Sequence, residues 1–165
     1  MSTVGAHGIE ARLPGGFDAH IFKRVPGPGE HCHPVAHFST FPLPAETGDF
    51  GGGAVTLMGP TDVFAVLFEY GPESLGTKLF SHQGMPRVLR DSDFRPNLLR
   101  RGIAGQAGTQ WFFTDGGRPF TFYAVLGSYA RRALLVPRVN DLIAGVSIVP
   151  AATPAGTAGP APAWN

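Results

Sequence analysis

The chain has a single cysteine, few charged residues and no long hydrophobic run. With Cys32 as its only cysteine, it cannot form an intrachain disulfide. Charged residues make up 15% of the sequence and the net charge is +1, so no strong overall field attracts nucleic acid. The longest apolar run, residues 63–68, is much shorter than the ~20 residues that span a bilayer. The N-terminal residues contain no apolar segment typical of a secretory signal. We therefore expect a cytoplasmic protein without a membrane segment.

The remaining composition indicates one globular domain that is rich in turns. Hydrophobic residues make up 43% of the 165 residues, which is enough for an ordinary core. The 23 glycines and 16 prolines favour short strands over long helices. The sequence predicts a single domain over residues 1–149. Residues 150–165 form a Pro/Ala/Gly-rich tail of low complexity, which predicts disorder.

Hydrophobic patterns predict the secondary structure. Residues 8–13 alternate apolar and charged side chains, which indicates a strand with one wet face, and residues 19–23 are expected to pair with it as a hairpin. Residues 62–70 are apolar on both faces, which predicts a central strand. Further strands are expected over 35–41, 54–58, 87–89, 109–114, 119–126 and 146–149, with an exposed loop over 42–53.

Turn and cap signals complete this prediction. Asp115-Gly116-Gly117-Arg118 predicts a hairpin turn because Asp-Gly favours positive φ. A short helix is expected within 91–101, capped by Ser92 or Asp93, and another from Pro137 to Gly145. The order of elements predicts an α+β fold with a mostly antiparallel sheet and helices packed on one side.

Three motifs resemble the PsbP-like superfamily, which includes small actinobacterial proteins of the LpqN type. They are Leu13-Pro14-Gly15-Gly16-Phe17, Arg118-Pro119-Phe120 leading into Tyr123-Ala124-Val125-Leu126-Gly127, and Val136-Pro137-Arg138-Val139-Asn140. The resemblance covers about residues 8–149. It implies an α/β sandwich built on an antiparallel sheet. It also implies a binding or accessory protein, since the family brings no catalytic residues.

The densest group of metal-ligand side chains is the segment His31 to His37. His31, His33 and His37 are all odd-numbered, so an extended segment places them on one face, with Cys32 on the other. Imidazoles in this spacing suit zinc or copper, with a fourth ligand from elsewhere. The alternatives are an ordinary surface loop and, less favoured, a reactive Cys32 thiol.

A second candidate site is an arginine-rich segment. Arg87, Arg90, Arg100 and Arg101 carry guanidinium groups that suit phosphate or carboxylate. Behind them, Gly102, Gly105 and Gly108 offer amides that can cradle an anion. The segment lacks the Gly-Lys-Ser/Thr ending of a phosphate-binding loop. The alternative is a solvated face whose charges pair with nearby aspartates.

No catalytic motif is complete in the sequence, so no catalytic residue is assigned and the enzyme question stays open. We expect a binding or accessory protein whose contact surface is the open sheet face or the loops over 25–53 and 91–108. Its partner is expected to be a protein or a second copy. Metal binding through the histidines and anion binding through Arg87–Gly108 are the alternative functions. The aromatic residues near positions 111–123 are expected to form core.

Overall fold

Strand β5 (Val63–Glu69) is the central element of the structure, a computed structural model that describes residues 1–152. Its residues 63–67 are completely buried because both faces of the strand are covered. β5 pairs with β4 (Val35–Ser39) and β7 (Arg118–Leu126). The five-stranded sheet is completed by β3 (Asp18–Phe22) beside β4 and β6 (Ala107–Asp115) beside β7, all antiparallel. The predicted central position of this strand is confirmed.

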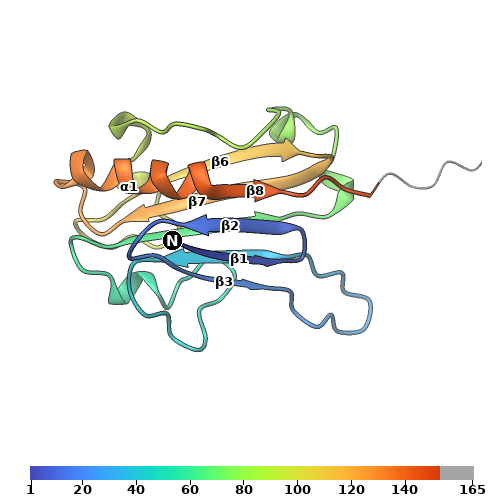
Figure 1. The fold of residues 1–165 in the computed structure, drawn as a ribbon, viewed down its shortest axis with the longest axis horizontal. Helices are drawn as coiled ribbons and strands as arrows, with labels where there is room; N and C mark the ends of the chain where they lie inside the picture. The colour runs from blue at the N-terminus through green and yellow to red at the C-terminus, as the bar shows by residue number, and fades with distance from the viewer. Residues whose placement is uncertain (153–165) are drawn as a thin grey trace, which may run out of the picture.

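A second antiparallel sheet of three strands lies in front of the first. It has the order β1 (Ser2–Ala6), β2 (Ile9–Leu13) and β8 (Val146–Ile148). The single α-helix of residues 1–152, α1 (Arg132–Gly145), runs into β8 and lies beside this small sheet (Figure 1). The predicted α+β class is confirmed. The expected layer of helices is replaced by one helix and a small sheet. The other helical segments are single 3₁₀ turns at Val55–Leu57, Pro72–Ser74, Lys78–Phe80, Asp91–Asp93 and Pro96–Leu98.

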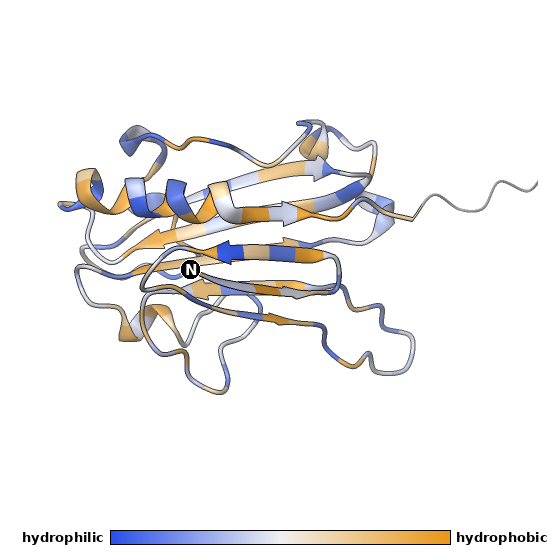
Figure 2. Cartoon of the chain, in the orientation of Figure 1, coloured by the Kyte–Doolittle hydropathy of each residue, from blue (hydrophilic) through white to orange (hydrophobic). Residues whose placement is uncertain are grey.

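The main core lies between the large sheet and the layer formed by α1 and β2. Apolar and polar residues alternate along β2, and α1 carries an apolar stripe (Figure 2). The buried side chains of α1 are Leu135, Val136, Val139, Leu142 and Ile143. They join one cluster with residues of β2, β5 and β7. A smaller cluster on the opposite face of the sheet includes Val55, Phe64, Val66 and Tyr123. Both faces of the large sheet are therefore covered for most of their extent.

The β6–β7 hairpin has the predicted turn. Asp115 pairs with Arg118, and the two central residues, Gly116 and Gly117, have φ of 58° and 75°. Two successive positive φ values define the tight turn that matches the twist of paired strands. The Asp-Gly signal therefore identified this hairpin correctly.

The predicted N-terminal hairpin is wrong. β2 pairs with β1 and β8, whereas β3 pairs with β4 in the other sheet. A turn does form after Leu13, since the Phe17 amide donates to the Pro14 carbonyl over 3.2 Å. Phe17 is then buried in the main core, which directs the chain from the small sheet into the large one. Alternation identified the buried face of β2 but not its partner strand.

Two predicted strands are also wrong. Residues 54–58 contain the 3₁₀ turn Val55–Leu57, because the amides of Ala54 and Val55 both donate to the Gly51 carbonyl. Residues 87–89 form no strand, because Leu89 is held by a side chain: its amide donates to Asn140 Oδ1 over 2.8 Å and its carbonyl accepts from Asn140 Nδ2 over 3.0 Å. The helix expected within 91–101 is reduced to two 3₁₀ turns, and Asp93 accepts from the Arg90 amide.

The last helix begins five residues earlier than predicted and continues through Pro137. Proline removes one intrahelical hydrogen bond. Because Ala133 and Pro137 are both exposed, water can bind the carbonyl that loses its donor. The helix ends at Gly145, as predicted. Here the backbone lies so close to β2 that a Cβ on Gly145 would overlap the carbonyl oxygen of Arg12.

A buried ion pair joins the two sheets at the end of β7. Arg118 Nε and Nη2 donate to the two carboxylate oxygens of Glu69 over 2.9 and 2.7 Å. The remaining guanidinium hydrogens are donated to the carbonyls of His7, Gly8 and Val149. All five donors of Arg118 are therefore used, and the side chains of Arg118 and Glu69 are each 11% exposed. Residues 1–152 contain no helix with the length and hydrophobicity of a membrane span.

Candidate functional site

His37 lies inside the fold and not on the surface. It points from β4 toward Phe22 and Phe64 and is completely buried. Its Nε2 lies 2.8 Å from the Asp49 carbonyl oxygen, which can only accept, so Nε2 carries the proton. Nδ1 then accepts from the Thr47 hydroxyl over 3.1 Å. Burial lowers the pKa of His37 because it disfavours the charged ring. The hydrogen bond to Asp49 raises the pKa, but by less than burial lowers it. The ring is a neutral structural group that anchors the loop 42–53.

This arrangement predicts a loss of stability in acid. Unfolded chains protonate histidine below about pH 6.5, whereas folded His37 stays neutral to lower pH. Unfolding therefore takes up a proton, and the free energy of unfolding decreases as the pH falls from 6.5 through the pKa of the folded state. Urea unfolding between pH 7.5 and 5 measures this decrease. The decrease should be smaller in His37→Gln and unchanged in His82→Gln, a substitution of an exposed histidine. Parallel curves for wild type and His37→Gln would contradict the prediction.

His31, Cys32 and His33 line a surface cavity. They belong to the loop before β4, which has no regular structure. The cavity has a volume of about 760 Å³ and lies between this loop and the end of β5. Its walls also include Phe68 and Tyr70, and its charged lining residues are Arg24, Glu30, Asp49, Glu69 and Glu73. Arg24 pairs with Asp49 over 2.7 Å and Glu69 with Arg118, which neutralises part of this charge.

The three predicted metal ligands are not brought together. His31 and His33 face the cavity, whereas both ring nitrogens of His37 are engaged within the core. The described part of the chain holds no group of three His, Cys, Asp or Glu residues that could bind a metal ion. Binding of zinc or copper stays a prediction from the sequence that this geometry does not support.

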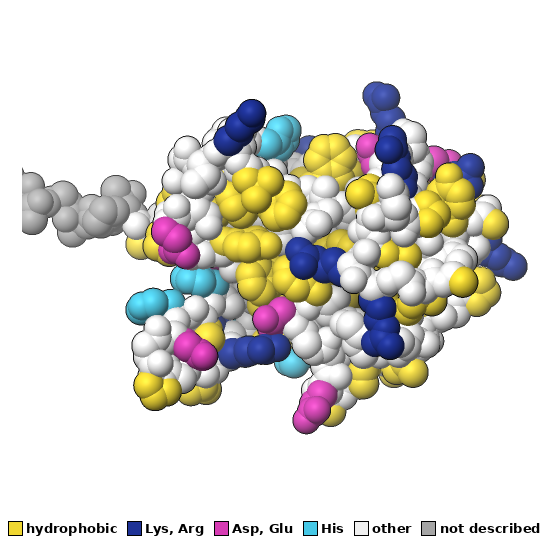
Figure 3. Space-filling view, turned by 180° about the vertical axis from the view of Figure 1, so that it is seen from behind, with side chains coloured by type: hydrophobic (Ala, Val, Ile, Leu, Met, Phe, Trp, Pro, Cys, Tyr) yellow, Lys and Arg dark blue, Asp and Glu magenta, His cyan; other side chains and the backbone are white. Residues whose placement is uncertain are grey.

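Beside the cavity, four aromatic side chains form a continuous row, here called the aromatic strip: Phe50, Phe68, Tyr70 and Phe112. Phe68 stacks on Phe50 with ring centroids 4.9 Å apart and meets the edge of Tyr70 at 4.9 Å. Tyr70 and Phe112 are 6.3 Å apart, and buried Phe80 packs beneath both. Each residue of the strip is half-buried. Hydrophobic side chains gather in the middle of this face (Figure 3).

Arg100 packs against one end of the strip. Its guanidinium carbon lies 3.5 Å from the centroid of Phe50, a cation–π contact. Its backbone amide donates to the Tyr123 hydroxyl over 2.9 Å. Burial raises the pKa of Tyr70, and the positive charge of Arg100 opposes this effect, which places the Arg100 charge near the Tyr70 hydroxyl. Residues of the segments 25–53 and 91–108 thus meet over the face of the large sheet that lies opposite α1.

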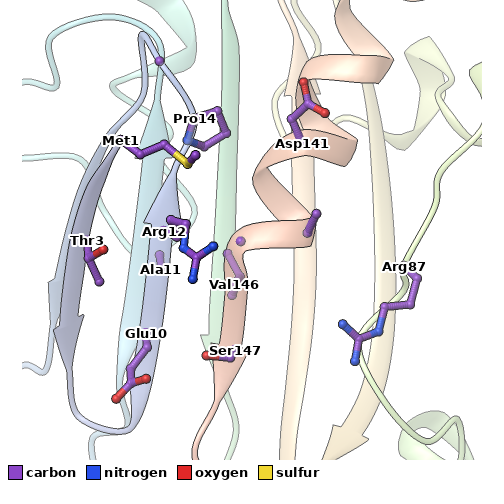
Figure 4. Close-up of a pocket in the computed structure, with 13 residues that line it drawn as sticks. Met1, Thr3, Glu10, Ala11, Arg12, Pro14, Arg87, Asp141, Val146 and Ser147 are labelled. Carbon is purple, nitrogen blue, oxygen red and sulfur yellow. The ribbon is translucent and has the colours of Figure 1, made fainter.

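Arg87 lies on the other side of the large sheet. It lines a second cavity, of about 790 Å³, beside the junction of α1 and β8. Arg12 and Arg87 lie on opposite sides of this junction, and Asp141 projects from the helix above it (Figure 4). The cavity also contains Glu10, so its lining carries both signs of charge. It has no excess of cationic groups typical of a phosphate site.

The predicted anion-binding arginines are therefore divided between two faces. Arg100 and Arg101 lie against the loop 48–53, where Arg101 donates to the Gly52 carbonyl over 3.1 Å. Arg90 is exposed beside the turn Asp91–Asp93. The amide of Gly108 donates to the Arg95 carbonyl over 3.0 Å, so it does not contribute to an anion cradle.

The aromatic strip is the feature that the sequence did not reveal. Phe113, Phe120, Phe122 and Tyr123 are buried, as expected for core. Phe112 instead lies at the margin of the core, in one row with Phe68 across Thr121. The one available signal was that Phe64, Val66 and Phe68 share a face of β5, with Tyr70 following directly after the strand. No family model, curated protein or solved structure matches this chain.

Proposed function

We propose that this protein acts by binding a polypeptide partner and that the aromatic strip with the adjoining cavity is its contact surface. One observation carries the proposal: aromatic side chains from a loop, β5 and β6 lie in continuous contact and each keeps part of its surface exposed. When a partner covers these rings, the burial of their apolar surface and the contacts between rings make binding more favourable. The resemblance to the PsbP-like superfamily, whose members mostly bind, agrees with this function.

The chemistry of the strip favours an extended, proline-rich segment. A polyproline II helix exposes its carbonyl oxygens, and each proline lacks an N–H, so such a segment needs hydrogen-bond donors and flat apolar surfaces. The Tyr70 hydroxyl and the Arg100 guanidinium supply donors, and the rings supply the surface. The cavity beside Phe68 and Tyr70 gives room for side chains of the bound segment.

A labelled decaproline peptide tests this function through its fluorescence anisotropy. The full-length protein is expected to bind it, and Tyr70→Ala and Phe112→Ala are each expected to weaken binding at least about tenfold, which corresponds to ~1.4 kcal/mol. Tyr129→Ala is the matched control, because Tyr129 is an exposed tyrosine outside the strip. Circular dichroism and thermal unfolding establish that the variants are folded.

Two outcomes would argue against this function. The first is an absence of binding by the wild-type protein up to millimolar peptide. The second is equal affinity of wild type, Tyr70→Ala and Phe112→Ala, which would place the peptide elsewhere on the surface.

A further inference from the structure

We infer that the occupant of the aromatic strip is the protein's own C-terminal segment, residues 153–165, bound within the same chain. This inference rests on the proposed function, because it names the polypeptide that the strip binds. Three observations carry it: where the described chain ends, how far the remaining residues reach, and which side chains they contain.

The described chain ends close to the strip. The Val149 amide donates to the Gly8 carbonyl over 2.9 Å, and the Ala151 amide donates to the Gly116 carbonyl over 2.8 Å. The chain is thus fixed at the β6–β7 turn as far as Ala151, which lies within the tail predicted to be disordered. The rest of that predicted tail, residues 153–165, lies outside the described residues. The same end of β7 contacts the strip, because the Tyr70 amide donates to the Pro119 carbonyl over 2.8 Å. The described chain therefore ends beside the same end of β7 that contacts Tyr70.

Residues 153–165 are long enough to extend along the whole aromatic strip. In a polyproline II conformation, with a rise of ~3.1 Å per residue, residues 153–165 extend about 40 Å. The strip is much shorter than this, since Phe50, Phe68 and Tyr70 follow one another at centroid spacings of 4.9 Å. Attachment to the same chain also raises the effective concentration of the segment into the millimolar range, so weak contacts are enough for occupancy.

The composition of the segment matches the strip. Residues 153–165 contain Pro154, Pro160, Pro162 and Trp164 and no Asp, Glu, Lys or Arg. The prolines favour the extended conformation, and Trp164 provides a large ring for stacking. The absence of charge in the segment suits the four aromatic rings of the strip, where the neighbouring Arg100 already stacks on Phe50.

The fluorescence of Trp164 tests this placement in the full chain. Trp111 is the other tryptophan, so Trp111→Phe leaves Trp164 as the single reporter. Acrylamide is expected to quench Trp164 about half as efficiently as it quenches a free peptide of residues 150–165. Adding Tyr70→Ala should restore the quenching of the free peptide, and adding Tyr129→Ala should not. Equal quenching in the protein and in the free peptide would overturn the inference.

A second measurement separates this inference from the proposed function. Replacing Pro154, Pro160, Pro162 and Trp164 with serine in the full chain should raise the affinity for decaproline at least about fivefold. If decaproline binds both proteins equally, the strip binds polypeptides but not this segment. If it binds neither, the proposed function itself fails. Sedimentation over a hundredfold range of concentration should show a monomer, and a dimer that dissociates in the serine variant would place the segment on a second copy.

Discussion

Arg118→Ala is expected to lower the free energy of unfolding by about 3–5 kcal/mol, as measured by urea denaturation. The substitution leaves the Glu69 carboxylate buried without its counter-charge and removes the donors of three backbone carbonyls. Arg118→Lys should lose nearly as much, because an ammonium group offers three donors where the guanidinium uses five. Since Arg118 contacts both sheets, the loss affects their connection and not only one turn.

The second ion pair of the described residues is the control. Arg24 and Asp49 are joined over the same 2.7 Å, but their side chains are 55% and 34% exposed. Arg24→Ala is therefore expected to cost about 0–1 kcal/mol. If Arg118→Ala does not fold, Glu69→Gln keeps the side-chain shape and is expected to cost about 1.5–3 kcal/mol. If Arg118→Ala is as stable as Arg24→Ala, burial of the ion pair does not determine its contribution to stability.

Gly145→Ala is expected to destabilise the protein by about 3 kcal/mol, at the upper end of the range for overpacking. The added methyl group would overlap the Arg12 carbonyl oxygen, and Arg12 lies in β2, the middle strand of the small sheet. Backbone in this position cannot move away without disturbing both pairings of β2. Helix propensity alone predicts the opposite result, a gain of up to ~1 kcal/mol for alanine in a helix.

Gly102→Ala is the matched control for this prediction. A Cβ on Gly102 meets no atom within 4 Å, and its φ lies outside the positive range. The substitution is expected to leave stability unchanged or to raise it by about 0.4–1 kcal/mol, through the lower entropy of the unfolded chain. Chemical denaturation of both variants shows whether the overlap at Gly145 outweighs the gain in helix propensity. A Gly145→Ala protein as stable as Gly102→Ala would show that α1 and β2 are not in close contact.

The parts of the fold that follow from local pattern were predictable. The apolar run of β5, the alternation of β2 and the Asp115-Gly116 turn each reflect a constraint that acts over a few residues. Strand partners were not predictable, because alternation shows which face is buried and not which strand lies alongside. β1 was missed because only Val4 and Ala6 in its five residues are apolar and neither is fully buried.

The candidate site was likewise predictable only in part. The histidines are neighbours in sequence, but β4 begins at Val35, so His37 points into the sheet while His31 and His33 remain in the preceding loop. Proximity along the chain therefore suggested a group that the fold separates. The aromatic strip shows the reverse, because the pairing of β5, β7 and β6 brings together residues that are distant in sequence. The segments 25–53 and 91–108 are not pure loops, since β4 lies within the first and the start of β6 within the second. Their role as a contact surface stays a prediction.

The pairing of β2 with β8 has a consequence for the order of folding. Ile9 lies opposite Ile148, so the small sheet closes only when the two ends of the domain meet. Contacts of such large sequence separation slow folding, because the chain loses loop entropy before the contact forms. During synthesis, strands β3 to β7 emerge before β8 and can assemble first. The apolar face of β2, formed by Ile9, Ala11 and Leu13, stays without its final cover until residues 132–148 leave the ribosome. The nascent protein therefore passes through an interval in which this surface is open to chaperones and to aggregation.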